Sequence, residues 1–344
     1  MSKSLCLGNH TPKPVPVSGL PFNYLKRGQD WIGGGCGMEQ SPIDIIPANS
    51  QSADDTMKMQ LYLTDHALTG LKVEDLGNTL QVNGSFSKLV ATDVDGHTYE
   101  FEAIQFHFHA PAEHTINGKH YDLELHIVHQ MTPESAKNAK THRNLAVVGV
   151  FFELDSEHLS TPHPFIEGLK LHNVGTDISL NMNDLLSDDL TDGMTFHAYK
   201  GSLTTPPCSE NANWYVLEKP LKITKNQMDN FNLRWKDNFN YANGHGNNRP
   251  VQPLNGRTVL KSTNCCVMGR SEECLMKMSL KQQQEEEKAE EVKTPSKTQK
   301  RALEEIEFMR DIIFDDLSLV GHHAISNSHE FIESNHQNKI KFAI

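Results

Sequence analysis

The sequence predicts one mainly β domain with minor helices, followed by a C-terminal extension that is helical or disordered. Three observations lead to this prediction. Short apolar and β-branched runs alternate with Gly, Asn, Asp and Pro turns as far as about residue 262. A capping box inside this region starts a short helix. Beyond residue 262 the composition becomes polar and charged, so the 344 residues are best divided into one domain with appendages rather than two domains.

The strand pattern is clearest in four runs of mostly apolar residues, at 59–63, 80–82, 99–101 and 145–152. The helix follows Thr224, which stands three residues before Gln227 in the capping box. Met228, Phe231 and Trp235 then recur at helical spacing. We expect this apolar stripe to pack in the core rather than to bind a cofactor.

Two histidines alternate along a run that reads as a β-strand. Successive side chains of a strand point to opposite faces, so His107 and His109 project from one face, with Gln105 before them on that face. Histidines that alternate with Phe106 and Phe108 also fit the polar positions of a half-buried strand. The spacing therefore indicates a metal site without deciding it.

A second run, residues 121–129, also reads as a strand, and the Asn117-Gly118 turn signal lies between the two. His126 can then join His107 and His109. Three imidazoles with no cysteine nearby are typical of a catalytic Zn²⁺ site, which keeps its fourth position open for water. Glu124 and Gln105 each stand two residues before a ligand histidine, so each is placed to hold a ligand ring by its second nitrogen.

Five motifs resemble those of the α-class carbonic anhydrases, in the same order. They are Gln40-Ser-Pro-Ile-Asp-Ile45, residues 106–119, residues 124–129, Gly201-Ser-Leu-Thr-Thr-Pro-Pro-Cys208 and Asn248-Arg-Pro-Val-Gln-Pro-Leu-Asn255. The sequence of residues 110–118 is most similar to that of bacterial, plant and protist members. The resemblance covers about 18–262 and implies a domain built around a large, mostly antiparallel twisted sheet. It leaves an N-terminal segment, 1–17, and a C-terminal extension, 263–344.

The resemblance implies reversible hydration of CO₂ to bicarbonate and a proton by a zinc-bound hydroxide. Zn²⁺ on three neutral imidazoles lowers the pKa of its water to roughly 7. Thr204 matches the threonine that accepts the hydroxide's hydrogen and donates its own to a glutamate, here Glu113. Because a carboxylate only accepts, this pair would orient the hydroxide toward its substrate.

A pocket for a small apolar substrate should be a mostly apolar wall beside the metal. The positions that build this wall in the family are matched by Val128, Val147, Leu203, Thr205, Ala212 and Trp214. Asn78 stands where fast members carry a histidine that relays the proton, and an amide does not titrate near neutral pH. We therefore expect an active enzyme limited by proton transfer, with His97 or His66 as alternative relays.

A second hypothesis treats the chain as a catalytically weak structural or interaction protein that acts through its C-terminal extension. Asn78 and the extension are its only support, since no ligand histidine is lost. Residues 275–301 are rich in Gln, Glu and Lys and predict a solvated helix or disorder. An amphipathic helix is expected at 295–318. It would pack on its own domain, associate with another copy or a partner protein, or lie on a membrane, which its rather acidic polar face makes the weakest alternative.

Charge and hydropathy exclude other functions. The net charge is −12 and the Lys and Arg residues are scattered, which argues against a nucleic-acid partner. We expect no transmembrane segment, because no apolar run is long enough. The substrate that the resemblance implies is a small molecule, CO₂ or bicarbonate.

The cysteines leave the compartment open. Cys36 and Cys208 match the pair that is bridged by a disulfide in secreted family members, which favours an oxidising compartment. The first residues carry too short an apolar run for a signal peptide, which favours the cell interior unless the true start lies upstream. Free thiols or bridges between chains are expected for the other four: Cys6, Cys265, Cys266 and Cys274.

Overall fold

The structure, a computed structural model, describes residues 22–31, 37–64, 66–155, 161–186, 194–235 and 243–268. The chain divides into two units, residues 1–275 and 276–344, and every described residue lies in the first unit. The N-terminal segment 1–17 and the helix expected at 295–318 lie outside the described residues. None of the helices in the described ranges is long and apolar enough to cross a membrane.

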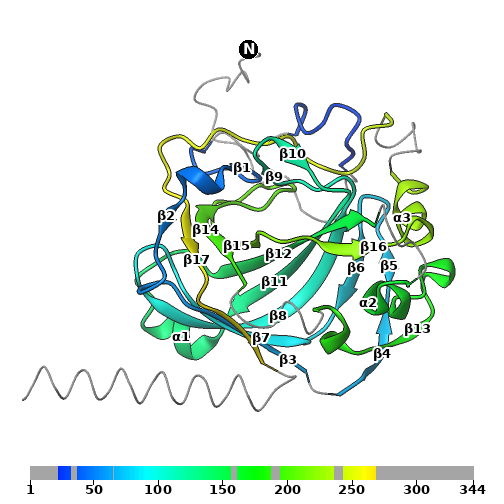
Figure 1. Cartoon of the computed structure of the whole chain (residues 1–344), viewed down its shortest axis with the longest axis horizontal. Coiled ribbons are helices and arrows are strands. Elements are labelled where there is room, and N and C mark those ends of the chain that lie inside the picture. The colour runs from blue at the N-terminus through cyan, green and yellow to red at the C-terminus, as the bar shows by residue number, and fades with distance from the viewer. Residues whose placement is uncertain are drawn as a thin grey trace, which may run out of the picture. The chain divides into compact units, whose positions relative to one another are not determined.

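A 13-stranded sheet dominates the described part of the chain (Figure 1). Ten of its strands follow one another in the order β18 (Cys265–Met268), β3 (Met59–Leu63), β7 (Ser87–Thr92), β8 (Thr98–His109), β11 (Leu123–Met131), β12 (Leu145–Leu154), β15 (Ala212–Leu217), β14 (Phe196–Gly201), β17 (Leu260–Ser262) and β2 (Gln51–Ser52). Beside this path, β16 (Leu221–Ile223) pairs with β12, and β6 (Leu80–Asn83) pairs with β8 and β5 (Glu74–Asp75). The predicted fold class, mainly β with minor helices, is confirmed.

Most pairings in the sheet are antiparallel, as expected, but four are parallel: β12 with β15, β12 with β16, β17 with β2, and β18 with β3. β18 lies beyond residue 262, where we expected the domain to end. Its Cys265 and Val267 side chains are buried in the main core, so the sheet continues to residue 268.

The remaining strands of the described residues form two small sheets. β1 (Asp44–Ile45), β9 (Thr115–Ile116) and β10 (Lys119–His120) form one, and β4 (Leu68–Lys72) pairs with β13 (Asp177–Leu180) in the other. The Asn117-Gly118 turn joins β9 to β10, and both residues have positive φ, 51° and 76°, as a two-residue hairpin turn requires. The predicted turn is therefore present, but it closes a small hairpin between β8 and β11 rather than linking them directly.

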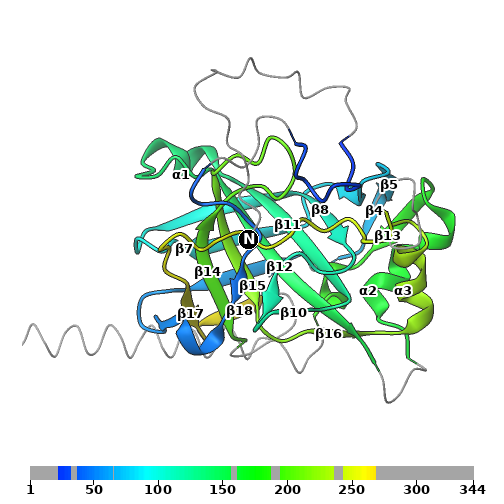
Figure 2. The ribbon, with the colours of Figure 1, turned by 90° about the horizontal axis from the view of Figure 1, so that it is seen from above.

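The helices are short. They are α1 (Pro133–Lys137), α2 (Pro164–Gly168), α3 (Lys225–Asn232) and the 3₁₀ turns η1 (Pro47–Asn49), η2 (Leu171–Asn173) and η3 (Met182–Asp184). The predicted capping box at Thr224 and Gln227 starts α3, and Met228, Phe231 and Trp235 are buried in the core. Figures 1 and 2 show α2 and α3 beside β4 and β13 at one end of the large sheet.

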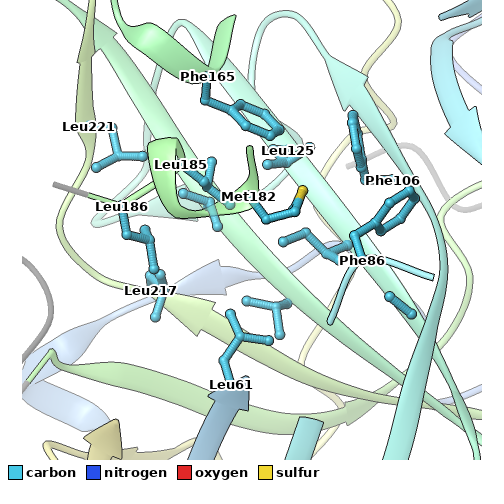
Figure 3. Close-up of a cluster of buried hydrophobic side chains, with 14 of the residues drawn as sticks. Leu61, Phe86, Phe106, Leu125, Phe165, Met182, Leu185, Leu186, Leu217 and Leu221 are labelled. Carbon is cyan, nitrogen blue, oxygen red and sulfur yellow. The ribbon is translucent and has the colours of Figure 1, made fainter. Parts of the chain in front are cut away.

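The main core lies between one face of the sheet and these helical segments. Phe106 and Leu125 come from β8 and β11, and Phe165 and Met182 come from α2 and η3 (Figure 3). A second apolar cluster contains Val128, Val147 and Trp214 and is separate from the first. Phe106 faces the main core while its neighbour His107 faces away from it, so the strand alternation that fills the core also presents the histidines.

Candidate metal centre

The three predicted ligand histidines come from two adjacent strands. In the antiparallel pairing of β8 with β11, His107 lies opposite His126, and His109 lies opposite Glu124. The ring centroids are 5.0 Å apart for His107 and His109, 5.2 Å for His107 and His126, and 4.6 Å for His109 and His126. One nitrogen from each ring lies within 4.8 Å of the other two. The structure thus brings together the predicted ligand set.

In each of the three rings, the nitrogen that points away from the other two histidines forms a hydrogen bond with an oxygen of the protein. The contacts, all 2.8 Å, are His107 Nδ1 to Gln105 Oε1, His109 Nδ1 to the Asn247 carbonyl, and His126 Nε2 to Glu124 Oε1. A carbonyl or carboxylate oxygen only accepts, so each ring donates its N–H outward. The nitrogens left free, Nε2 of His107 and His109 and Nδ1 of His126, then carry lone pairs that face one another.

Burial favours the neutral form of His107 and His109. It lowers the pKa of His107 well below its ordinary value, and the neighbouring His109 and His126 lower it further. Burial also lowers the pKa of His109, against the opposing charge of Glu113. The buried Nε2 of His109 has no hydrogen-bond partner among the described residues. Three imidazoles whose inward nitrogens lie close together, with that of His109 unpaired, fit a divalent cation such as Zn²⁺.

Glu124 is the buried anchor of the centre. Burial alone would raise its pKa, but its interactions with His114 and His126 hold the pKa well below its ordinary value. Its Oε1 accepts from His114 Nδ1 at 2.7 Å, and its Oε2 accepts the backbone N–H groups of Glu113 and His114 at 2.8 and 2.9 Å. A Cβ at Gly149 would come 3.1 Å from Oε1, so the glycine leaves room for this carboxylate.

Glu113 lies beside the histidines, and its side chain is fully buried. Its Oε1 accepts the Arg249 backbone N–H at 2.8 Å, and its Oε2, 4.0 Å from His126 Nδ1, has no partner among the described residues. Thr204 is also buried, in the loop between β14 and β15. Within the described ranges no hydrogen bond joins Thr204 to Glu113, so their predicted pairing stays a prediction.

A sequence profile described as eukaryotic-type carbonic anhydrase matches residues 28–263. The chain belongs to this family. A carbonic anhydrase of Klebsiella pneumoniae is 36% identical over 234 residues, which cover 65% of this chain and 80% of that protein. One from Nostoc sp. is 34% identical over 230 residues, covering 66% and 76%. The solved structure of carbonic anhydrase Cah3 from Chlamydomonas reinhardtii in complex with acetazolamide superposes with a TM-score of 0.50 at 31% identity, covering 65% of this chain and 91% of that one.

The expected apolar wall of this carbonic anhydrase occupies adjoining strands. Val128 of β11 lies opposite Val147 of β12, which lies opposite Trp214 of β15. These three residues and Ala212 are buried in the second apolar cluster, and Leu203 packs against that cluster. The Trp214 ring lies 4.8 Å from His126, so the wall borders the histidines. Thr205, the remaining predicted pocket residue, is half-buried and accepts the Cys208 backbone N–H at 2.8 Å.

Asn78 precedes β6 and lies near the back of His109, because Asn247 donates from Nδ2 to the Asn78 carbonyl at 2.9 Å. His97, one of the alternative relays, precedes Thr98 at the start of β8, whereas His107 and His109 end that strand. At about 3.3 Å per residue, His97 is roughly 30 Å from the ligands. It is therefore excluded as a relay. His66 is exposed in the loop before β4.

The predicted disulfide is not supported. Cys208 is a free, buried thiol whose pKa burial raises to about 11. Cys36 lies outside the described residues, and no disulfide occurs within them. Cys265 is also free and buried, with its pKa raised by burial to about 12. Cys6 and Cys274 lie outside the described residues, as does the side chain of Cys266.

Two supporting residues were missed in the sequence. Asn247 holds His109 through a backbone carbonyl, which any residue type provides, so no sequence signal marks it. Arg143 is buried, and its Nη1 donates to the carbonyls of Gly201 and Ala212 at 2.8 and 3.3 Å. It also pairs with Glu39. Arg143 thus ties together the two ends of the loop that carries Thr204.

Proposed function

We propose that this protein catalyses the reversible hydration of CO₂ to bicarbonate and a proton with a Zn²⁺ ion held by His107, His109 and His126. The observation that carries the proposal is the set of three inward lone pairs, each fixed by an outward N–H donated to a protein acceptor. When bound, Zn²⁺ lowers the pKa of a water ligand to roughly 7 and so supplies a nucleophile at neutral pH.

Glu113 and Thr204 are proposed to orient the attacking water. Glu113 already uses Oε1 for the Arg249 N–H, which leaves Oε2 as the acceptor for one more hydrogen. If Thr204 donates to this oxygen, its own oxygen is left to accept a hydrogen from the water. Once this water has lost one proton, its remaining hydrogen would be committed to Thr204, which leaves a lone pair to face the substrate.

The substrate side is proposed to be the apolar wall of Val128, Val147, Leu203 and Trp214. CO₂ carries no charge and accepts only weak hydrogen bonds, so a wall of hydrocarbon beside the ligands admits it without fixing it tightly. Bicarbonate is charged and loses solvation against the same wall, which favours its release to water. Thr205 and Ala212 complete the proposed pocket.

Proton release is proposed to be the slow step. An imidazole at position 78 would titrate near neutral pH, whereas the Asn78 amide does not exchange a proton there. The proton left by each hydration must then reach the solvent by another route, such as a small buffer molecule. We therefore propose an active enzyme whose turnover is limited by proton transfer.

Metal analysis and CO₂ hydration on the same purified chain test this function. We expect about one Zn²⁺ per chain and a stopped-flow hydration rate that falls by at least about 100-fold in His107→Ala. His172→Ala is the matched control, because His172 is exposed and lies in η2, outside the two strands that carry the ligands. A chain that binds no Zn²⁺, or one whose His107→Ala variant hydrates CO₂ at the original rate, would contradict the proposal.

A further inference from the structure

A second group of reactive side chains lies near the edge of the large sheet that ends in β2. Ser50 follows η1 just before β2, His197 lies on β14, and Glu218 follows β15. Ser50 Oγ is 3.1 Å from His197 Nδ1, and His197 Nε2 is 2.8 Å from Glu218 Oε2. In the sheet β14 is the third strand from β11, so about 14 Å separates it from the strand that carries His126. The group shares no residue with the metal centre.

The hydrogen bonds among Ser50, His197 and Glu218 determine which atom donates and which accepts in each pair. The Glu218 carboxylate accepts only, so His197 donates from Nε2 and keeps the lone pair on Nδ1. Ser50 then donates its hydroxyl hydrogen to Nδ1, which is the arrangement of a serine activated by a general base. The ring is turned relative to the usual serine hydrolase order, in which Nε2 faces the serine. Either imidazole nitrogen can take the proton, because the two are equivalent in acid–base terms once the opposite nitrogen carries a hydrogen.

The surroundings keep His197 available as a base. Burial lowers its pKa, against the hydrogen bond and negative charge of Glu218, so the ring is neutral at pH 7. Lys261 is the other charged group at this ring, and its Nζ is 3.2 Å from Glu218 Oε2. Ser50 Oγ also approaches the Ile46 carbonyl, but at 3.4 Å that contact is too long to compete with His197.

Ser50 lines a cavity of about 300 Å³, and the fully buried His197 is its hydrogen-bond partner. Asn49 and Thr258 line the same cavity, and their side chains make no hydrogen bond within the described ranges. An amide N–H₂ and a hydroxyl are donors of the kind that stabilise an oxyanion. The cavity wall therefore holds the proposed nucleophile and two donors, and the base lies behind Ser50 in the protein interior.

We propose that Ser50 is the nucleophile of a second, metal-independent site that hydrolyses small uncharged esters. Ser50 Oγ attacks the ester carbonyl carbon while its proton passes to His197 Nδ1. The carbon–oxygen bond to the leaving group breaks, and the departing alcohol takes that proton. Water then attacks the acyl-serine with His197 again as base, which releases a carboxylic acid and restores Ser50.

The chemistry of the cavity wall selects the substrate class. Ile46, Leu254 and Val259 make much of the wall apolar, and a volume of about 300 Å³ limits the ligand to a short acyl group. Arg257 also lines the cavity, but its guanidinium donates to backbone carbonyls of Lys200, Gln40, Leu254 and Pro253. Asp44 adds a negative charge. No free cation is therefore offered to an anionic substrate by the described lining residues, and a neutral ester fits best.

A fluorophosphonate probe, which reacts with activated serines, tests this site on the full chain after Zn²⁺ has been removed with a chelator. Peptide mass spectrometry should find the adduct on Ser50. Labelling should disappear in Ser50→Ala and persist in Ser52→Ala, a control two residues away whose hydroxyl donates to Asp54. Glu218→Gln keeps a hydrogen-bonding group but loses the charge, and it should slow labelling by about tenfold or more.

Hydrolysis of 4-nitrophenyl acetate gives the second measurement. We expect the metal-free chain to retain an esterase rate that Ser50→Ala abolishes and Ser52→Ala preserves. CO₂ hydration by the zinc-loaded Ser50→Ala variant should equal that of the unmodified chain, so this test is independent of the proposed function above. An unlabelled Ser50, or metal-free hydrolysis that survives Ser50→Ala, would overturn the proposal.

Discussion

Each ligand histidine depends on the residue that accepts its outward N–H. His107 uses the neutral amide of Gln105, His109 uses the backbone carbonyl of Asn247, and His126 uses the carboxylate of Glu124. Such acceptors fix the tautomer and the ring direction and make the ligand more basic. Gln105 is the easiest of the three to test, because its side chain is only half-buried and its loss should not disturb folding.

Gln105→Ala should weaken Zn²⁺ affinity by about 10- to 100-fold, because His107 loses the acceptor that orients its ring. The measurement is a competition titration against a chelator of known affinity. Gln130→Ala is the control, since Gln130 is a half-buried amide on β11 that contacts only the Asn144 carbonyl. Equal affinities in the two variants would show that the Gln105 contact does not support the ligand.

Asn78→His should raise CO₂ turnover in dilute, non-imidazole buffer by about tenfold or more, because an imidazole there can relay protons. Addition of an imidazole-type buffer should raise the CO₂ turnover of the unmodified chain and so reduce the difference in turnover between it and Asn78→His. The assay is stopped-flow hydration at several buffer concentrations. A wild-type rate that is already independent of buffer would count against a limit set by proton transfer.

At this scale the sequence predicts side-chain ligands well and backbone partners poorly. That His107, His109 and His126 come together was predicted because strand alternation puts the first two on one face and a turn signal brings the next strand beside them. Asn247 was not identified, because the atom that holds His109 is a carbonyl that every residue has. Arg143 was missed for a related reason, since its partners are carbonyls brought near only by the tertiary fold.

Among the elements, β11 carries a second buried histidine with a different role. His129 bonds to the Ile127 carbonyl through Nδ1 and to Ser87 Oγ through Nε2, both at 3.0 Å. Burial lowers its pKa to about 4, against 6.5 in the ordinary state. Between these values the unfolded chain binds a proton that the folded chain does not. This contribution to stability is therefore complete above pH 6.5 and is lost as the pH falls toward 4.

From pH 7 to pH 5, His129 should lower the free energy of unfolding by about 2 kcal/mol. His129→Gln, which can still bond to Ser87, should remove this part of the pH dependence even if it lowers stability overall. Urea unfolding of the zinc-loaded chain at both pH values measures the difference. The same loss of stability in both proteins would assign the pH dependence to other groups.

Strand existence was easier to predict than strand partners. The runs at 59–63 and 145–152 are both strands in the structure, because their residue types favour a pleated, buried surface. The parallel pairing of β12 with β15 was not predicted, since periodicity within a strand says nothing about the direction of its neighbour. β18 was missed because Cys265 and Cys266 follow polar residues and resemble the start of the extension.

For the molecule as a whole, β18 defines where the folded domain can end. Two chains shortened at the C-terminus, one ending at residue 275 and one at residue 262, separate the possibilities. The longer one keeps β18 and should match the full chain in thermal unfolding and CO₂ hydration. The shorter one loses the buried side chains of Cys265 and Val267, so its free energy of unfolding should fall by about 2 to 4 kcal/mol.

Differential scanning calorimetry and the hydration assay compare these two chains with the full one. Size-exclusion chromatography of the longer chain also tests whether residues 276–344 drive self-association, because a changed stoichiometry would assign that role to them. If the chain ending at residue 262 unfolds at the same temperature as the full chain, then β18 adds nothing to the stability of the sheet.

The outward hydrogen bonds of His107, His109 and His126 belong wholly to the polypeptide. We therefore expect folding to set each ring's tautomer and direct its inward nitrogen, so that metal binding need not organise the site. Small zinc fingers behave in the opposite way, since they remain unfolded until metal arrives. In this chain we expect that a metal ion removed by a chelator can be replaced without refolding, because the fold does not depend on the metal.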